Sequence, residues 1–295
     1  MNERGGHTVA AKIWDEQSSW SQAANRLKTT ITRARTLALA LGTAGAILGT
    51  ASSQIMGEHK ALGQALAFVA ALAAGTVPLL AARMGPTAVQ QWTRLRSMSE
   101  AIKNEVYVYL AGVSPYRGPA PEVLLRERVD RLHCEVTDLL PFLTGIAPAS
   151  RALPAVTEID SYVNVRLKGQ ITGYYRPKAL KMGRRLTTVR RVEFAIGGAG
   201  AALGALAGAL GIAQAAAWVA VAAVTAAAVS AHSTASKYVY QQVEFVRTAD
   251  ELERLLGRWS ARSGRTEQSD DEFVRRCEDV ISVLNESWMV KWSTE

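Results

Sequence analysis

Charged side chains are missing from three long stretches of this sequence. No Asp, Glu, Lys or Arg occurs in residues 36–57, 61–82 or 194–236. A helix in a soluble bundle normally keeps a charged face toward water, and these stretches offer none. The first two are close to the roughly 20 residues that cross a bilayer as a helix, and the third is about twice that length. We therefore expect an all-α membrane protein, rather than a soluble bundle of buried helices.

The third stretch must fold back on itself, because a single helix of that length would be far longer than a bilayer is thick. A turn around Gly211 to Gln214 divides it into two spans, which gives two transmembrane helical hairpins and four spans in all. The intervening polar parts are expected to be long cytoplasmic helical extensions. The predicted order is an N-terminal segment, the first hairpin, a helical body, the second hairpin and C-terminal helices: residues 1–35, 36–82, 83–193, 194–236 and 237–295.

Catalytic and metal-binding motifs are also missing. The sequence has no GxSxG, HExxH or Walker loop, and its four histidines are scattered without metal-ligand spacing. Its two cysteines, Cys134 and Cys277, form no CxxC pair, so we expect ordinary buried thiols rather than a disulfide. We expect a protein that is not an enzyme, with no cofactor and no metal site.

No ionisable carboxylate or cation lies at membrane depth, which disfavours an ion-coupled pump or transporter. A pore needs only water, hydroxyl groups and backbone carbonyls. The candidate pore or gate residues are the small polar side chains in or beside the spans: Thr50, Ser53, Gln54, Thr225, Ser230 and His232. His232 is either a pH-sensitive element or an ordinary interfacial histidine.

Positive charge is concentrated at the outer ends of the two hairpins. Arg33, Arg35, Arg83, Arg190 and Arg191 are examples, whereas the hairpin loops contain only Lys60. Under the positive-inside rule both termini and the central segment are cytoplasmic, in a multi-pass protein of the inner (plasma) membrane. The net charge of +8 therefore suits anionic lipid headgroups, and we expect the lipid bilayer, not nucleic acid, as its partner.

Glycines recur at intervals of four in spans one and three. Such spacing places them on one helix face, where backbones can approach closely without a hydrophobic drive to associate. They either pack the bundle internally or form a seam between subunits of an oligomer. The residues concerned are Gly45, Gly49, Gly200, Gly204 and Gly208.

Outside the spans, apolar periodicity predicts further helices. The first covers residues 88–110 and continues span two with a bend at Gly85-Pro86, and the second covers residues 122–140. Helix resumes at residue 158 and leads into span three, with Pro177 as a kink. Span four is expected to run on toward Trp259. After a polar linker over residues 260–271, a last amphipathic helix begins at the acidic residues 270–272.

The two halves resemble each other, since each has a basic approach, a hairpin and a helical exit. The exits contain Arg96 and Glu100 in one half and Arg247 and Glu251 in the other. Each pair is four residues apart, so we expect an ion pair on one helix face in both. The pattern indicates an internal duplication.

The helix before span three carries Tyr162, Arg166, Gln170 and Tyr174 at successive intervals of four. They form a polar and aromatic stripe that drifts slowly around a helix. The stripe is either a packing seam against the exit helices or a surface for a partner or small anionic ligand, with Arg166 supplying the charge.

Together with the exit and tail segments, this stripe resembles the SLATT family of bacterial membrane proteins. The resemblance covers nearly the whole chain, although this chain has two hairpins where the simplest family pattern has one. The matching positions that we single out are Arg96, Glu100, Tyr162, Arg166, Gln170, Tyr174, Glu278 and Trp288.

The resemblance implies a homo-oligomeric, pore-forming effector of a bacterial conflict system. It also implies a trigger, either a cytoplasmic sensor protein or a nucleotide that binds the helical body. The alternative is a non-conducting membrane scaffold that recruits a soluble partner through its cytoplasmic helices. A small-molecule transporter is a third option, but the charged residue that a transporter usually has within a span is absent from this sequence.

Overall fold

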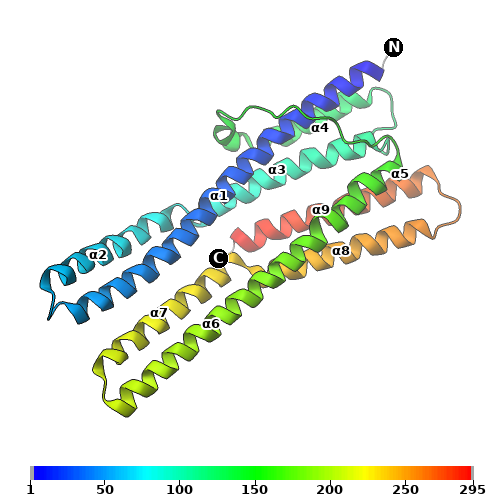
Figure 1. Ribbon diagram of the computed structural model, residues 1–295. Coiled ribbons are helices and arrows are strands. Elements are labelled where there is room, and N and C mark those ends of the chain that lie inside the picture. Colours follow the sequence, from blue (N-terminus) through cyan, green and yellow to red (C-terminus); the bar gives the residue numbers. More distant parts are fainter. Residues whose placement is uncertain (1–2, 294–295) are drawn as a thin grey trace. The chain divides into compact units, whose positions relative to one another are not determined.

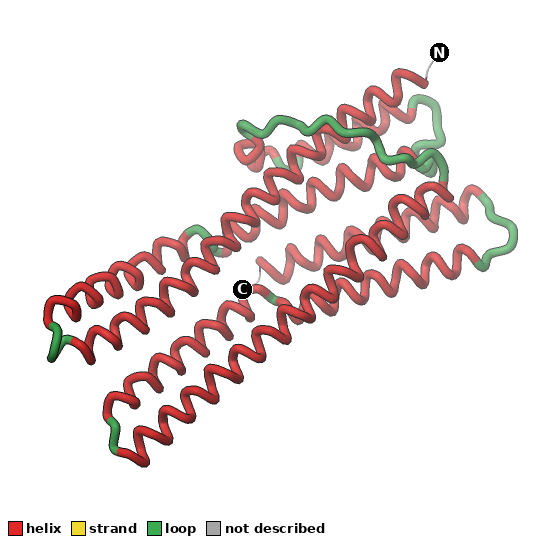
Figure 2. The backbone as a smooth tube through the Cα atoms, viewed as in Figure 1, coloured by secondary structure: helices red, strands yellow, loops and turns green. Residues whose placement is uncertain are grey.

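The computed structural model describes residues 3–293, with side chains described for residues 9–212 and 214–282. Within this range the chain consists of helices and connecting loops and contains no strand (Figure 2). The all-α prediction is therefore confirmed. The side chain of Trp288 lies outside the described residues.

The chain forms two compact units. The body unit comprises the residues up to Thr29, Pro86–Ala179 and the residues from Val243 onward. The hairpin unit comprises Thr30–Gly85 and Leu180–Gln242. Each unit is thus assembled from segments that are far apart in the sequence.

The hairpin unit contains two antiparallel pairs of helices. Helices α1 (Glu3–Ile55) and α2 (Lys60–Ala82) lie side by side in one pair, and α6 (Arg176–Leu210) and α7 (Ala213–Ser236) in the other (Figure 1). The turn between α6 and α7 is where the sequence predicts it, and Gly211 there has a φ of +67°, which suits glycine. Within the described residues, four helices are long and apolar enough to cross a membrane.

Large apolar side chains project outward from these helices instead of filling a core. Phe68 on α2 is 65% exposed and Phe194 on α6 is 84% exposed. The same holds for several other residues of the spans: Leu62, Leu72, Leu79, Leu206, Leu210 and Val224. So much contiguous apolar surface is unfavourable in water, so these helices contact the lipid bilayer.

Helix α3 (Pro86–Leu110) is central to the body unit. It packs against α9 (Glu267–Ser293) and against α4 (Pro121–Cys134). The apolar face predicted for it is buried, including Leu95, Ile102 and Val106, which are fully covered. From α9, Val274 and Cys277 are buried as well.

A proline-rich loop over residues 144–157 is fastened along the first part of α1. The Arg151 side chain donates a hydrogen bond of 2.6 Å to the Trp14 carbonyl oxygen, and its guanidinium stacks 3.9 Å from the Trp14 ring centre. The backbone N–H of Ala149 donates to the Ser18 hydroxyl at 2.7 Å. Because this loop has no regular secondary structure, its backbone N–H groups need side-chain partners, and Ser18 provides one for Ala149.

Two of the predicted continuous helices are broken. Helix α2 ends at Ala82 and α3 starts afresh at Pro86, because proline lacks the N–H that would continue α2 and fits the first position of a new helix. Helix α7 ends at Ser236, and Lys237 adopts a φ of +49° before α8 (Tyr238–Ser260) begins. The sequence has no glycine or proline at Lys237 to signal this break.

The predicted helix over residues 122–140 is too long. Helix α4 stops at Cys134, and a 3-10 helix covers Thr137–Leu143. Arg94 of α3 holds the Asp138 carboxylate at 2.5 and 2.9 Å, and Pro141 disfavours α-helical geometry in the residue before it. Cys134 is exposed, so the expectation of a buried thiol is wrong for it and right for Cys277.

The last helix begins earlier than its acidic residues suggest. Thr266 and Ser269 cap each other, since each side-chain oxygen accepts a hydrogen bond from the other's backbone N–H, at 3.0 and 3.2 Å. This reciprocal pairing satisfies N–H groups at the start of α9. The polar linker therefore spans only residues 261–266.

Candidate functional site in the body unit

The stripe before span three lies on an unusually wound helix. After a short α5 (Ile159–Tyr162), the segments Val163–Leu167 and Gly169–Tyr175 are π-helical and lead directly into α6. Hydrogen bonds between residues five apart widen the turn, and such turns occur frequently at functional sites. Pro177 lies in the first turn of α6.

Arg166 is buried against Glu278 of α9. Its Nε and Nη2 atoms donate to the two carboxylate oxygens at 2.9 and 2.8 Å, and the Tyr162 hydroxyl donates to Oε1 of the same carboxylate at 2.8 Å. The guanidinium also lies 4.5 Å from the ring centre of Tyr107. This bidentate pairing joins the π-helical segment to α9.

The interpretation of Arg166 as a charge for a ligand does not fit this geometry. The Arg166 and Glu278 side chains are 1% and 2% exposed, so solvent does not reach either group. Burial and the nearby Glu278 charge also raise the pKa of the Tyr162 hydroxyl, which stays protonated as a hydrogen-bond donor. The first half of the stripe, Tyr162 and Arg166, is therefore a packing seam against α9.

Helix α3 carries a second group of charges in the body unit. The Glu100 carboxylate forms ion pairs with Arg96 at 2.6 Å and with Lys103 at 2.8 Å. Burial alone raises the pKa of Glu100, but attraction by Arg96, Lys103 and Arg166 outweighs it and gives a pKa of about 2. Burial lowers the pKa of Lys103 to about 8, although Glu100 opposes this effect.

These charged residues line a cavity of about 240 Å³ within the body unit, which we call the α3 pocket. It brings together Arg96, Glu100, Gln170 and Tyr174, four of the positions singled out in the sequence. Its other lining residues come from α1, α3, the π-helical segment, α6, α8 and α9: Asn25, Lys28, Trp92, Lys103, Tyr175, Lys178, Phe245 and Ile281.

The pocket is cationic and aromatic. Arginine and lysine supply four of its side chains, and Glu100 is the one carboxylate among its described lining residues. Lys28 lies 5.1 Å from the Trp92 ring centre and Lys178 lies 5.5 Å from the Tyr174 ring centre. Tyr174 in turn meets Phe245 edge to face at 6.0 Å.

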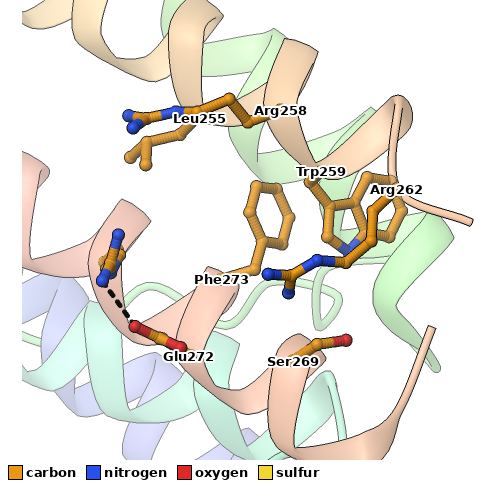
Figure 3. A pocket seen from close by; sticks show the side chains of 8 residues that line it. Leu255, Arg258, Trp259, Arg262, Ser269, Glu272 and Phe273 are labelled. Atoms are coloured by element: carbon orange, nitrogen blue, oxygen red, sulfur yellow. Dashed lines mark ion pairs between the residues drawn. The ribbon is translucent and has the colours of Figure 1, made fainter. Parts of the chain in front are cut away.

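A second, smaller hollow of about 160 Å³ lies where α8 turns into α9 (Figure 3). Trp259 and Phe273 stack at its base with ring centres 4.8 Å apart. Arg258 and Arg262 reach over it from α8 and the following loop, while Arg276 pairs with Glu272 at 2.5 Å. We call this feature the arginine hollow.

In the hairpin unit, most of the singled-out glycines face the partner helix of their own hairpin. A Cβ atom on Gly45 would lie 3.3 Å from the Ala70 carbonyl oxygen, and one on Gly200 would lie 3.2 Å from Ala222. Gly49 and Gly204 make looser approaches, at 3.8 and 3.9 Å. A Cβ on Gly208 would have no neighbour within 4 Å among the described atoms.

Gln54 connects the two hairpins within the hairpin unit. Its Nε2 donates to the Gln214 carbonyl oxygen at 3.0 Å, and its Oε1 accepts from Trp218 Nε1 at 3.1 Å. Ser53 donates to the Thr50 carbonyl and Thr225 to the Val221 carbonyl, so both hydroxyls bond to their own helices. Ser230 is exposed, and His232 is partly exposed on the same helix.

Sequence reasoning missed several residues of the α3 pocket. Trp92 and Lys103 were missed, although they lie at intervals of four and three from Arg96 and Glu100, a spacing that places all four residues on one face of α3. Lys28 and Phe245 come from α1 and α8, and no spacing in the sequence links them to the residues on α3. The expected ion pair between Arg247 and Glu251 is wrong, since Glu251 binds Arg254 and Arg258 instead.

Comparison with known families gives one match in each half of the chain. Residues 162–288 match the family described as SMODS and SLOG-associating 2TM effector domain 1, abbreviated SLATT. Residues 18–123 match a second family, described as a protein of unknown function (DUF4231). No curated protein and no solved structure gives a match to the chain.

Proposed function

Since residues 162–288 belong to the SLATT family of two-span effector domains, we propose that the protein is a membrane effector that forms or gates an ion-conducting pore. It acts as a homo-oligomer in a bacterial conflict or defence system. It is not an enzyme, and its conducting element is the hairpin unit. The family match carries this proposal, because it covers α6 and α7 together with the helices that precede and follow them.

The composition of the spans supports a passive pathway. Among the described spanning helices, the segments 36–57, 61–82 and 194–236 carry no carboxylate, lysine or arginine that would couple transport to a bound ion. Hydroxyl groups such as those of Ser53 and Ser230 are exposed on the hairpin unit. Such groups and the backbone are sufficient to line a water-filled pathway.

Oligomerisation follows from the small size of one hairpin unit. Two hairpins are too few to enclose a wide aqueous channel, so several copies must contribute. Gly208 supplies a face for close approach, because no described atom lies within 4 Å of a Cβ placed on it, whereas Ala222 of α7 lies close to Gly200. We propose that the protein lies in the inner membrane with both termini in the cytoplasm, where a sensor protein or nucleotide reaches the body unit.

Single-channel recording of the purified protein in planar bilayers tests conduction, with mass photometry on the same sample to count subunits. Discrete current steps from a defined oligomer are the expected result. The matched variant is Gly208→Leu, which we expect to reduce both the oligomer and the current. A well-folded oligomer that stays silent with every trigger and voltage would refute the pore.

The arginine hollow favours a second candidate function. Arg258 and Arg276 expose most of their side chains there, at 64% and 54%. An exposed cluster of arginines beside an aromatic stack suits an acidic segment of a soluble protein. On this reading the protein is a non-conducting scaffold, and Arg258→Gln with Arg262→Gln would abolish partner recruitment and the cellular phenotype together.

A further inference from the structure

The walls of the α3 pocket combine cations with aromatic rings, and this combination indicates the chemistry of an occupant. Guanidinium and ammonium groups donate charge-assisted hydrogen bonds to phosphate oxygens. The faces of Trp92, Tyr174 and Phe245 offer surfaces on which a flat ring can stack. We propose that the α3 pocket binds a small phosphate monoester that carries one flat ring.

The charge balance on α3 creates the demand for an anion. Arg96 and Lys103 share a single carboxylate, that of Glu100. These three side chains are 28%, 19% and 9% exposed, so solvent screens them only partly. Lys28 and Lys178 also line the same cavity. A phosphate bound there receives charge-assisted hydrogen bonds from Arg96 and Lys103, which Glu100 already holds in place.

The size of the cavity limits the ligand. At about 240 Å³, it lies just below the range of about 300 to 1,000 Å³ that holds drug-sized molecules. One ring and one phosphate group therefore fill it. Glu100 repels additional negative charge, which favours a monophosphate over a polyphosphate.

The aromatic lining distinguishes this pocket from a simple anion site. Each of the two lysines at the cavity already lies against a ring, Lys28 against Trp92 and Lys178 against Tyr174. A planar ligand inserted beside these rings keeps the ammonium groups near both the π-face and the phosphate. Inorganic phosphate alone would use only the cationic half of the lining.

Isothermal titration calorimetry of the full chain in phosphatidylcholine nanodiscs tests the proposal. The probes are phenyl phosphate, inorganic phosphate and phenol. We expect phenyl phosphate to bind about tenfold more tightly than either fragment, since each fragment loses one half of the contacts. Arg96→Gln is expected to weaken phenyl phosphate by about tenfold or more, as for loss of a charged hydrogen bond.

Two controls keep the result interpretable. Arg126→Gln removes the same charge from an exposed position on α4 and is expected to leave binding unchanged. Lys28→Gln and Lys178→Gln weaken binding while sparing the Glu100 contacts, so they replace Arg96→Gln if that variant fails to fold. Equal affinity in the wild type and in all three pocket variants would overturn the proposal, as would equal affinity for phenyl phosphate and inorganic phosphate.

A lipid headgroup is the other source of a phosphate group. Loss of phenyl phosphate binding in nanodiscs that contain phosphatidylglycerol would overturn the assignment to a soluble ligand. Unchanged binding there supports it. Because binding is read as heat, without any current, this proposal and the proposed pore succeed or fail independently.

Discussion

The ion pair between Arg166 and Glu278 is the most completely buried charge in the described part of the body unit. Charges taken out of water carry a large desolvation cost, which good geometry and additional hydrogen bonds offset. Here both oxygens of Glu278 accept from Arg166 and one also accepts from Tyr162, while Nη1 of Arg166 is buried without a hydrogen-bond partner among the described residues. The pair therefore specifies how the π-helical segment docks on α9, and removing either partner leaves the other charge buried and uncompensated.

We expect Glu278→Gln to destabilise the body unit by about 3–5 kcal/mol, the usual cost of breaking a buried pair. Thermal unfolding followed by circular dichroism in detergent measures the loss. The matched control is Glu272→Gln on the same helix, where the pair with Arg276 is about half exposed and is worth only a few tenths of a kcal/mol. Similar unfolding temperatures for both variants would contradict the structural role assigned to Arg166.

Lys103 gives ligand binding a dependence on pH. With a pKa of about 8, its ammonium group loses its charge as the pH rises from 7.5 to 9.5. The groups that influence it are Arg96 and Glu100 on α3 and Arg166 on the π-helical segment. Glu100, with a pKa of about 2, and the arginines keep their charges over this range. Phenyl phosphate is also fully ionised above its second pKa of about 6.

We therefore expect the affinity for phenyl phosphate to fall by about tenfold between pH 7.5 and 9.5, since the charged form of Lys103 binds more tightly than the neutral form by about the worth of one charged hydrogen bond. Lys103→Arg keeps its charge throughout and is expected to bind with little change over the same range. Calorimetry at four pH values distinguishes the two. A Lys103→Arg variant with the same pH profile as the wild type would show that another group is responsible.

At the scale of helices, the hairpins depend on glycine where two backbones approach closely. Gly200→Leu would place a side chain where even a Cβ lies 3.2 Å from Ala222, so α6 and α7 must separate. We expect a loss of about 1–3 kcal/mol of stability, the usual cost of overpacking. Gly197→Leu on the same helix meets nothing within 4 Å and serves as the control in the same thermal unfolding experiment.

Gly208 tests a different contact. A Cβ on this residue meets none of the described atoms within 4 Å, so Gly208→Leu is expected to leave the thermal stability of the monomer nearly unchanged. If this face forms the seam between subunits, the same variant lowers the subunit number counted by mass photometry. An unchanged oligomer would exclude Gly208 from the seam, while Gly200→Leu reports on the hairpin alone.

The sequence predicted most of the helices because their signals are local. Absence of charge identified the spans, and apolar spacing identified the buried face of α3. The breaks were harder to predict. After α4 the chain continues as a 3-10 helix whose Asp138 binds Arg94, 44 positions away in the chain, and Lys237 adopts its positive φ without a glycine to signal it.

The candidate site was only half visible in the sequence for a related reason. Arg96, Glu100, Gln170 and Tyr174 were found through their spacing within two helices. Lys28 and Phe245 join them only through tertiary packing of α1 and α8 in the body unit. Arg166 looked like an available charge because its acceptor, Glu278, lies 112 positions away in the chain.

At the scale of the whole molecule, the orientation in the membrane decides which solution reaches the body unit. Lysine and arginine near the ends of the spans predict that both termini are cytoplasmic. The two natural cysteines make this testable, because Cys134 is exposed whereas Cys277 is buried. Burial and the neighbouring Glu278 charge also raise the pKa of the Cys277 thiol, which keeps it unreactive.

We expect a membrane-impermeant maleimide to leave Cys134 unlabelled in intact spheroplasts and to label it after lysis. In a Cys134→Ser background, Lys60→Cys at the start of α2 is expected to react in intact spheroplasts, because the hairpin turn faces the opposite side. Cys134→Ser alone controls for Cys277. Labelling of Cys134 before lysis would place the body unit outside the cell, where neither a cytoplasmic sensor protein nor an intracellular phosphate ester could reach the α3 pocket.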